Sequence, residues 1–121
     1  MSKVPPAPAN VNLAEPKDTS FTLDELKQYD GSDATKPIYV AVKGTVFDVT
    51  TDPTKRDTYR PGASYHVFAG KDASKALGLS SLQPEDAIAD YSSLDTAQLK
   101  VLDDWYEYYK GKYNIVGKVV S

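Results

Sequence analysis

The sequence has no cysteine, a single histidine and a single methionine among its 121 residues. Without cysteine, disulfide frameworks, thiolate zinc sites, iron–sulfur clusters and cysteine nucleophiles are excluded. His66 is the only histidine, so a site that needs two histidines from one chain is excluded, and a Ser-His-Asp triad could use only His66 as its base. Tyrosine, by contrast, is abundant, with nine residues against three phenylalanines and one tryptophan. If a side chain of this protein binds a metal, phenolate and carboxylate are the available ligands.

Long apolar runs and an excess of positive charge are also missing. No stretch of 18 apolar residues occurs, so no segment is expected to span a membrane. Acidic residues outnumber basic ones by 17 to 14, and the net charge is −3. A nucleic-acid-binding protein normally carries a clustered basic excess, and a polybasic membrane patch needs one too. The charge balance therefore predicts that the protein binds no nucleic acid. The length predicts one globular domain.

The first 20 residues differ in composition from the remainder. Four of the eight prolines lie here, and the apolar residues between them follow no period. Proline fixes φ and lacks a backbone donor, so this stretch predicts a flexible, extended arm over residues 1–20. The folded domain is predicted over residues 21–121.

Local signals predict an α+β domain with a small sheet. Thr22 and Glu25 fit a capping box at the start of a short helix over 23–29. Residues 38–42 and 45–49 are rich in β-branched and aromatic side chains and predict a hairpin, followed by a long polar loop over 50–62. Further expected elements are helices over 64–69 and 72–77 (capped by Asp72 and closed by Gly78), a brief helix at Pro84, a long helix from Asp95 or Thr96 to Gly111, and a last strand over 113–120.

The loop from Tyr59 to Tyr65 carries an aromatic residue at each end and runs into a predicted helix. Such a loop can place a phenol at the rim of a pocket. A neutral phenol is a poor ligand, but ferric iron can displace its proton, and tyrosine is a known haem ligand. Half-buried packing of Tyr65 is the alternative interpretation. Adjacent residues on a helix point about 100° apart, so Tyr65 and His66 cannot both face one iron from the same side. This favours a solvent-facing or locally bonded His66.

Other candidate groups have simpler interpretations. A helical stripe of Leu99, Leu102, Trp105, Tyr106 and Tyr109 predicts core packing. Lys112 and Tyr113, at the start of the last strand, could give a cation and a donor to an acidic ligand. The acidic residues between positions 86 and 107 have no EF-hand spacing and predict a solvated face. The stretch around Gly70 matches neither a P-loop nor a dinucleotide fingerprint.

Several motifs, taken in order, resemble one known family. Residues 67–77, VFAGKDASKAL, resemble its central "FAGxDASxxLA" motif. The other matching segments are FTLDEL at 21–26, YDG at 29–31, KGTVFDVT at 43–50, LDDW at 102–105 and KYNIVG at 112–117. The sequence is thereby similar to the membrane-associated progesterone receptor family, whose members are cytochrome b5-like haem/steroid-binding domains. The resemblance covers about residues 21–120 and implies the cytochrome b5-like fold.

The resemblance also implies a cofactor and its ligand. The family's pocket lacks the two axial histidines of cytochrome b5, and its iron is held by the tyrosine that ends a "Y-G-x-x-G-x-Y" loop. Carried over, the axial ligand to the iron of haem b is Tyr65, the first tyrosine of the loop is Tyr59, and Lys112 and Tyr113 hydrogen-bond the ligand phenol or the haem. Arg60 stands where the family usually has glycine. It would strain a loop that needs a positive φ at this position, or it could pair with a haem propionate.

The resemblance finally implies a role. We expect a five-coordinate b-type haem whose phenolate ligand stabilises ferric iron, so haem-dependent assembly or haem handling is expected rather than electron shuttling or enzymatic activity. The expected partners are haem, sterols, microsomal haem-thiolate monooxygenases and a second copy of the chain. The family's membrane-spanning N-terminal segment is missing from this sequence, which fits either a naturally soluble member or a chain from which the anchor was removed. The expected location is the cytoplasm, with the periphery of the endoplasmic reticulum as one option, since family members are often anchored to membranes. The alternative is a steroid- or lipid-binding adaptor whose pocket never holds haem. A hydrolase that uses His66 is disfavoured, because no nucleophile and orienting acid are arranged for it.

Overall fold

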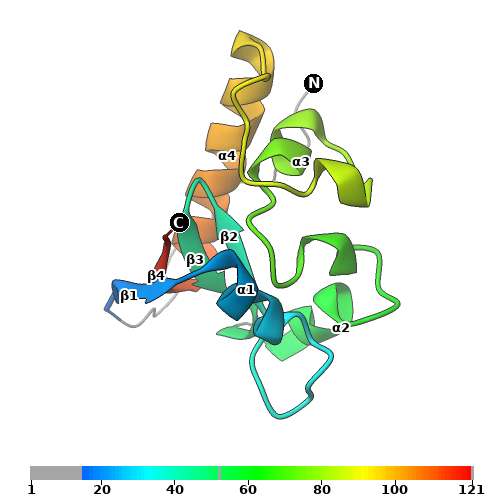
Figure 1. Cartoon of the computed structure of the whole chain (residues 1–121), viewed down its shortest axis with the longest axis vertical. Coiled ribbons are helices and arrows are strands. Elements are labelled where there is room, and N and C mark those ends of the chain that lie inside the picture. The colour runs from blue at the N-terminus through cyan, green and yellow to red at the C-terminus, as the bar shows by residue number, and fades with distance from the viewer. Residues whose placement is uncertain (1–14, 52, 121) are drawn as a thin grey trace.

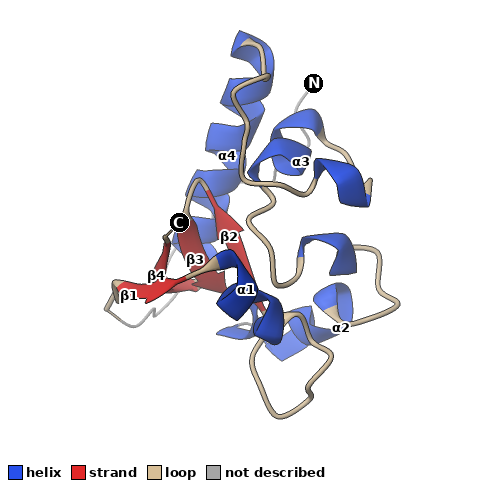
Figure 2. Cartoon of the chain, viewed as in Figure 1, coloured by secondary structure: helices blue, strands red, loops and turns tan. Residues whose placement is uncertain are grey.

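A four-stranded mixed sheet forms one side of the domain (Figures 1 and 2). The structure is a computed structural model that describes residues 15–51 and 53–120. The strands are β1 (Thr19–Phe21), β2 (Tyr39–Val42), β3 (Thr45–Asp48) and β4 (Asn114–Val119), in the order β1-β4-β3-β2. β2 and β3 form the predicted antiparallel hairpin, and β3 pairs antiparallel with β4. The α+β class and the small mixed sheet are confirmed.

The sequence analysis missed the strand β1 and placed the start of the folded domain too late. Thr19 and Ser20, which the sequence analysis placed in the arm, pair in parallel with Gly117 and Lys118 of β4. Lys17 adds a backbone hydrogen bond from its N–H to the carbonyl of Ile115, at 3.0 Å. A three-residue strand shows no alternating pattern of its own, so its pairing depends on a partner almost 100 residues away. Residues 1–14 of the predicted arm lie outside the described part.

The described part of the chain also forms four α-helices, which lie beside the sheet. They are α1 (Leu23–Leu26), α2 (Arg56–Tyr59), α3 (Ser74–Leu79) and α4 (Thr96–Lys112). Short 3₁₀ turns occupy Lys27–Tyr29, Val49–Thr51, Pro53–Lys55, His66–Phe68 and Pro84–Asp86. In Figure 1 the long helix α4 runs up beside α3, while α1 and α2 lie at the opposite end of the molecule. The predicted long loop over 50–62 is therefore wrong in part, because short helical turns and α2 occupy most of it.

Local capping was predicted correctly at two helices. The Thr22 hydroxyl accepts from the Glu25 N–H, and the Glu25 carboxylate accepts from the Thr22 N–H, so the capping box is complete. α4 begins at Thr96 behind the N-cap residue Asp95, within the predicted range. These signals are accurate because each involves groups only three residues apart.

Three predicted helix boundaries are wrong. Asp72 is not the cap of α3; the N-cap residue is Ala73, and the Asp72 carboxylate instead accepts from the N–H groups of Ser74 and Gly44. Gly78 does not end α3 but lies within it, and the helix ends at its C-cap residue Ser80, which adopts the left-handed conformation. Glycine is needed at position 78 because a Cβ would come within 2.4 Å of the Leu94 side chain. α4 likewise continues through Gly111 to Lys112.

The main core lies between the sheet, α3 and α4. It contains Phe47 and Val49 from the hairpin side and Leu102 and Tyr109 from α4, all fully or almost fully buried. The predicted α4 stripe is thus confirmed for Leu102 and Tyr109, whereas Leu99 is exposed. Trp105 and Tyr106 are half-buried against the same core. No helix in residues 15–51 and 53–120 is both long and apolar enough to cross a bilayer.

Candidate functional site

The loop between α2 and the 3₁₀ turn at His66–Phe68 carries the candidate ligand Tyr65. Arg60 adopts an extended conformation with φ −66°, so it needs no left-handed backbone. Gly62 provides the positive φ, +88°, that turns the chain. The Arg60 side chain is exposed and lies 3.4 Å from the Asp57 carboxylate. An arginine at position 60 is therefore compatible with the loop without backbone strain.

Tyr65 lies where two cavities meet. Its half-buried ring packs against Tyr59 and Phe68, at ring-centroid distances of 5.8 and 5.5 Å. One cavity, of about 240 Å³, has mainly apolar walls that include Leu77, and the other, of about 220 Å³, is bordered by phenols, Lys55 and Thr58. Tyr65 and Trp105 line both cavities. Tyr65 thus borders one cavity with mainly apolar walls and another whose walls include phenols, a lysine and a threonine.

Buried phenols surround the second cavity. The hydroxyls of Tyr59 and Tyr109 are 2.7 Å apart in a buried hydrogen bond. Burial raises the pKa of the Tyr59 phenol well above its usual value, with the neighbouring Tyr109 contributing in the same direction. Burial raises the pKa of Tyr109 as well. Both phenols are therefore neutral hydrogen-bonding groups at physiological pH.

The structure brings three of the four predicted binding residues together. Tyr59, Tyr65 and Tyr113 all line the second cavity. Lys112 is the last residue of α4 rather than a residue beyond it, and its Nζ lies 5.6 Å from the centre of the Tyr108 ring, which lines the same cavity. Lys112 is thus connected to the cavity through an aromatic neighbour.

His66 is half-buried and bonds to a segment 36 residues away, rather than facing solvent or bonding locally as the sequence predicted. Its Nε2 lies 3.1 Å from the backbone carbonyl oxygen of Asp30. Within the described ranges, no three histidine, aspartate or glutamate side chains gather in a way that could hold a metal ion.

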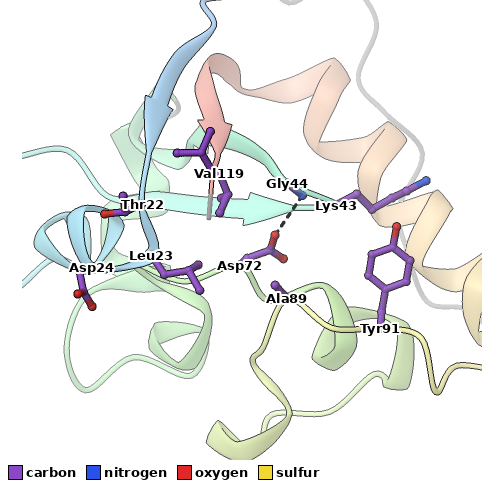
Figure 3. Close-up of a pocket in the computed structure, with 10 residues that line it drawn as sticks. Thr22, Leu23, Asp24, Lys43, Gly44, Asp72, Ala89, Tyr91 and Val119 are labelled. Atoms are coloured by element: carbon purple, nitrogen blue, oxygen red, sulfur yellow. Dashed lines mark hydrogen bonds between the residues drawn. The ribbon is translucent and has the colours of Figure 1, made fainter.

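A second, larger groove lies over Asp72 (Figure 3). It has a volume of about 600 Å³ and runs from the start of α1 past the β2–β3 turn to the end of β4. Apolar walls come from Leu23, Ala89 and Val119, with the Asp72 carboxylate at the centre and Tyr91 at one end. Leu23 is 47% exposed, so part of this apolar wall is accessible to solvent.

Sequence reasoning missed several of these residues. Trp105 and Tyr109 were assigned to core packing, and Asp72 to a helix cap. Trp105 lines both cavities beside Tyr65, Asp72 lines the groove, and Tyr109 bonds the cavity residue Tyr59. These positions depend on contacts between distant segments, such as Tyr59 with Tyr109, 50 residues apart, and Gly44 with Asp72, 28 residues apart. No local pattern signals such contacts. The family motifs around Asp72 and Trp105 were the only available signal.

Comparisons with known proteins find matches to both the sequence and the fold of this chain. Residues 22–117 match the family described as "Cytochrome b5-like Heme/Steroid binding domain". A solved Arabidopsis thaliana protein with a cytochrome b5-like fold is 44% identical, with a TM-score of 0.76 over 92% of this chain and 99% of that one. "Probable steroid-binding protein 3" of A. thaliana is 48% identical over 84% of this chain and 98% of its own length.

Membrane-protein relatives match over the same region. "Membrane steroid-binding protein 1" of Oryza sativa subsp. japonica is 45% identical over 94% of this chain. "Membrane-associated progesterone receptor component 2" of Rattus norvegicus is 37% identical over 90% of this chain. The chain spans about half the length of these two relatives, 46% and 50% respectively.

The fold and the matched region define a cytochrome b5-like domain of the haem/steroid-binding class. The chain belongs to this family and, within it, to the group of plant steroid-binding proteins and membrane-associated progesterone receptor components. The family resemblance inferred from the sequence motifs is confirmed.

Proposed function

We propose that this protein binds one b-type haem, with the Tyr65 phenolate as the axial ligand to ferric iron. The observation that carries the proposal is the position of Tyr65, half-buried at the junction of the two cavities. Phenolate is a hard anionic ligand suited to ferric iron, and a coordinating phenolate needs hydrogen-bond donors around it. Tyr59 and Tyr113 are the phenols placed to provide them.

The residues present fit the cofactor chemically. The first cavity offers Phe68, Leu77 and Leu82 as apolar surface for a porphyrin face. The second offers Lys55 and Thr58, a cation and a hydroxyl of the kind that interacts with carboxylates such as propionates. Bound haem supplies an iron centre that a phenolate holds in the ferric state. The protein's own residues bind and orient it, and no residue is proposed to catalyse a reaction.

The role that follows is haem-dependent interaction. A five-coordinate haem leaves one side of the iron open to a second copy of the chain or to another partner. We propose haem-thiolate monooxygenases of the endoplasmic reticulum and their sterol metabolism as the regulated system, with the protein acting in the cytoplasm at the periphery of that membrane. These are expectations from the family resemblance.

Titration with ferric haem tests the binding proposal. We expect the haem spectrum to change until one equivalent has been added, and the complex to survive gel filtration. Competition with apomyoglobin then gives the dissociation constant. Uptake that never saturates, or haem that leaves the protein completely on the column, would contradict the proposal.

Steroid binding independent of haem is a second candidate, and the groove over Asp72 favours it. Its volume of about 600 Å³ lies within the usual range for small-molecule sites, roughly 300–1,000 Å³, whereas the cavities beside Tyr65 are smaller. It combines apolar walls with a few polar groups, among them Lys43 and Asp72.

The steroid candidate predicts a ligand-induced rise in melting temperature in the haem-free protein. With progesterone as the probe, Leu23→Ser should abolish the rise, because it removes an apolar wall of the groove. Leu99→Ser is the matched control, since Leu99 is similarly exposed, at 38% against 47%, and lies on α4 outside the groove. An equal rise in both variants, or none in the unmodified protein, would eliminate this site.

A further inference from the structure

Tyr109 is a fully buried phenol whose role sequence analysis assigned to packing alone. Its side chain is 1% exposed, and its ring contacts Phe47 and Trp105. Its hydroxyl, within the described residues, has one hydrogen-bond partner, the hydroxyl of Tyr59 at 2.7 Å. Tyr59 is itself 3% exposed. The bond therefore lies in the interior, where its direction has an energetic consequence.

The direction of this hydrogen bond follows from satisfying the buried proton. If Tyr59 donated to Tyr109, the Tyr109 proton would have no acceptor, and a buried unsatisfied donor costs about 1–3 kcal/mol. If Tyr109 donates, only a lone pair of its oxygen stays unused, which costs less because a hydroxyl oxygen has two. Tyr109 is therefore the donor and Tyr59 the acceptor.

This direction releases the proton of Tyr59 for another acceptor. The Tyr59 ring lies 5.8 Å from the Tyr65 ring, and both residues line the same cavity. The donor chain that starts at Tyr109 and passes through Tyr59 therefore ends on the side of Tyr65. Hydrogen bonds in such a chain polarise one another, so the last donor is strengthened.

We propose that Tyr109 is a positioning residue that directs the phenol proton of Tyr59 toward an anionic oxygen in the cavity beside Tyr65. The inference rests on the proposed function, in which that oxygen is the Tyr65 phenolate bound to ferric iron. A donor hydrogen bond withdraws electron density from a phenolate ligand. Tyr109 thereby tunes the iron without touching the haem.

The test compares Tyr109→Phe with Tyr106→Phe in the ferric haem complex. Tyr106 is the matched control, because it lies on the same helix, also packs against Phe47, and its hydroxyl has no hydrogen-bond partner within the described residues. In Tyr109→Phe we expect the phenolate-to-iron charge-transfer band to move to longer wavelength and the reduction potential to become more negative. Haem affinity should fall by about tenfold, the equivalent of one hydrogen bond to a charged group. Tyr106→Phe should leave all three quantities unchanged.

A second substitution at position 109 should shift the charge-transfer band and the reduction potential in the opposite direction. Incorporation of 3-fluorotyrosine at position 109 makes its phenol a more acidic, stronger donor, so the band should move to shorter wavelength and the potential should rise. It also covers the case in which Tyr109→Phe does not fold. An unchanged band and potential in both variants would show that Tyr109 only packs. If the unmodified protein lacks a charge-transfer band altogether, the proposed ligation fails first, and the two failures are thus distinguishable.

Discussion

Tyr65→Phe is expected to lower the affinity for ferric haem by more than about 100-fold and to remove the phenolate charge-transfer band. Residues that merely support a metal ligand are worth about 10- to 100-fold, so loss of the ligand itself should exceed that range. The substitution deletes one oxygen and keeps the ring contacts with Tyr59 and Phe68. The visible spectrum and competition with apomyoglobin measure both effects.

Tyr91→Phe is the control for this result. Tyr91 is also half-buried, and it lines the groove over Asp72 rather than the cavities beside Tyr65. It should bind haem as the unmodified protein does. If Tyr91→Phe lost haem while Tyr65→Phe retained it, haem would belong in the groove and the present assignment of the two sites would be wrong.

Gly117→Ala is expected to destabilise the fold by about 3 kcal/mol, the upper part of the usual range for overpacking. A Cβ at this position would lie 2.2 Å from the backbone oxygen of Thr19 and 2.5 Å from the Phe21 ring. Because Thr19 and Gly117 are paired in the parallel β1–β4 ladder, β1 would have to move away from the sheet. For a domain of this size the loss corresponds to a melting temperature lower by about 15 °C, measurable by circular dichroism.

Gly44→Ala separates this contact from the general cost of replacing glycine. Gly44 has a φ of +79°, and nothing lies within 4 Å of a Cβ built there. Its replacement should therefore cost only the backbone strain, about 1–2 kcal/mol. Equal destabilisation by the two substitutions would mean that the close approach of β1 to β4 is not what requires glycine at position 117.

Much of the fold could be predicted because its signals are local. The capping box at Thr22, the hairpin around Gly44 and the start of α4 after Asp95 each depend on residues a few positions apart. The errors arose where distant segments meet. Gly78 looks like a helix stop in the sequence, but it is a helical residue that lets Leu94 approach α3.

In the candidate site, too, residues with a local sequence signal could be predicted and residues placed by distant contacts could not. Tyr65 was singled out because the loop motif identifies it, and the structure adds the cavities on either side of its ring. Spacing alone could not distinguish a ligand from a packed phenol. Tyr109 could not be found from the sequence, because its partner Tyr59 is 50 residues away and the stripe on α4 explains its burial equally well.

Resonance Raman spectroscopy of the ferric haem complex, excited in the charge-transfer band, tests the central claim most directly. If the Tyr65 oxygen is bound to iron, phenolate vibrations should be enhanced, should shift when the protein contains ring-deuterated tyrosine, and should be absent in Tyr65→Phe. A complex without enhanced tyrosine vibrations, or with the signature of an imidazole ligand from His66, would contradict the account.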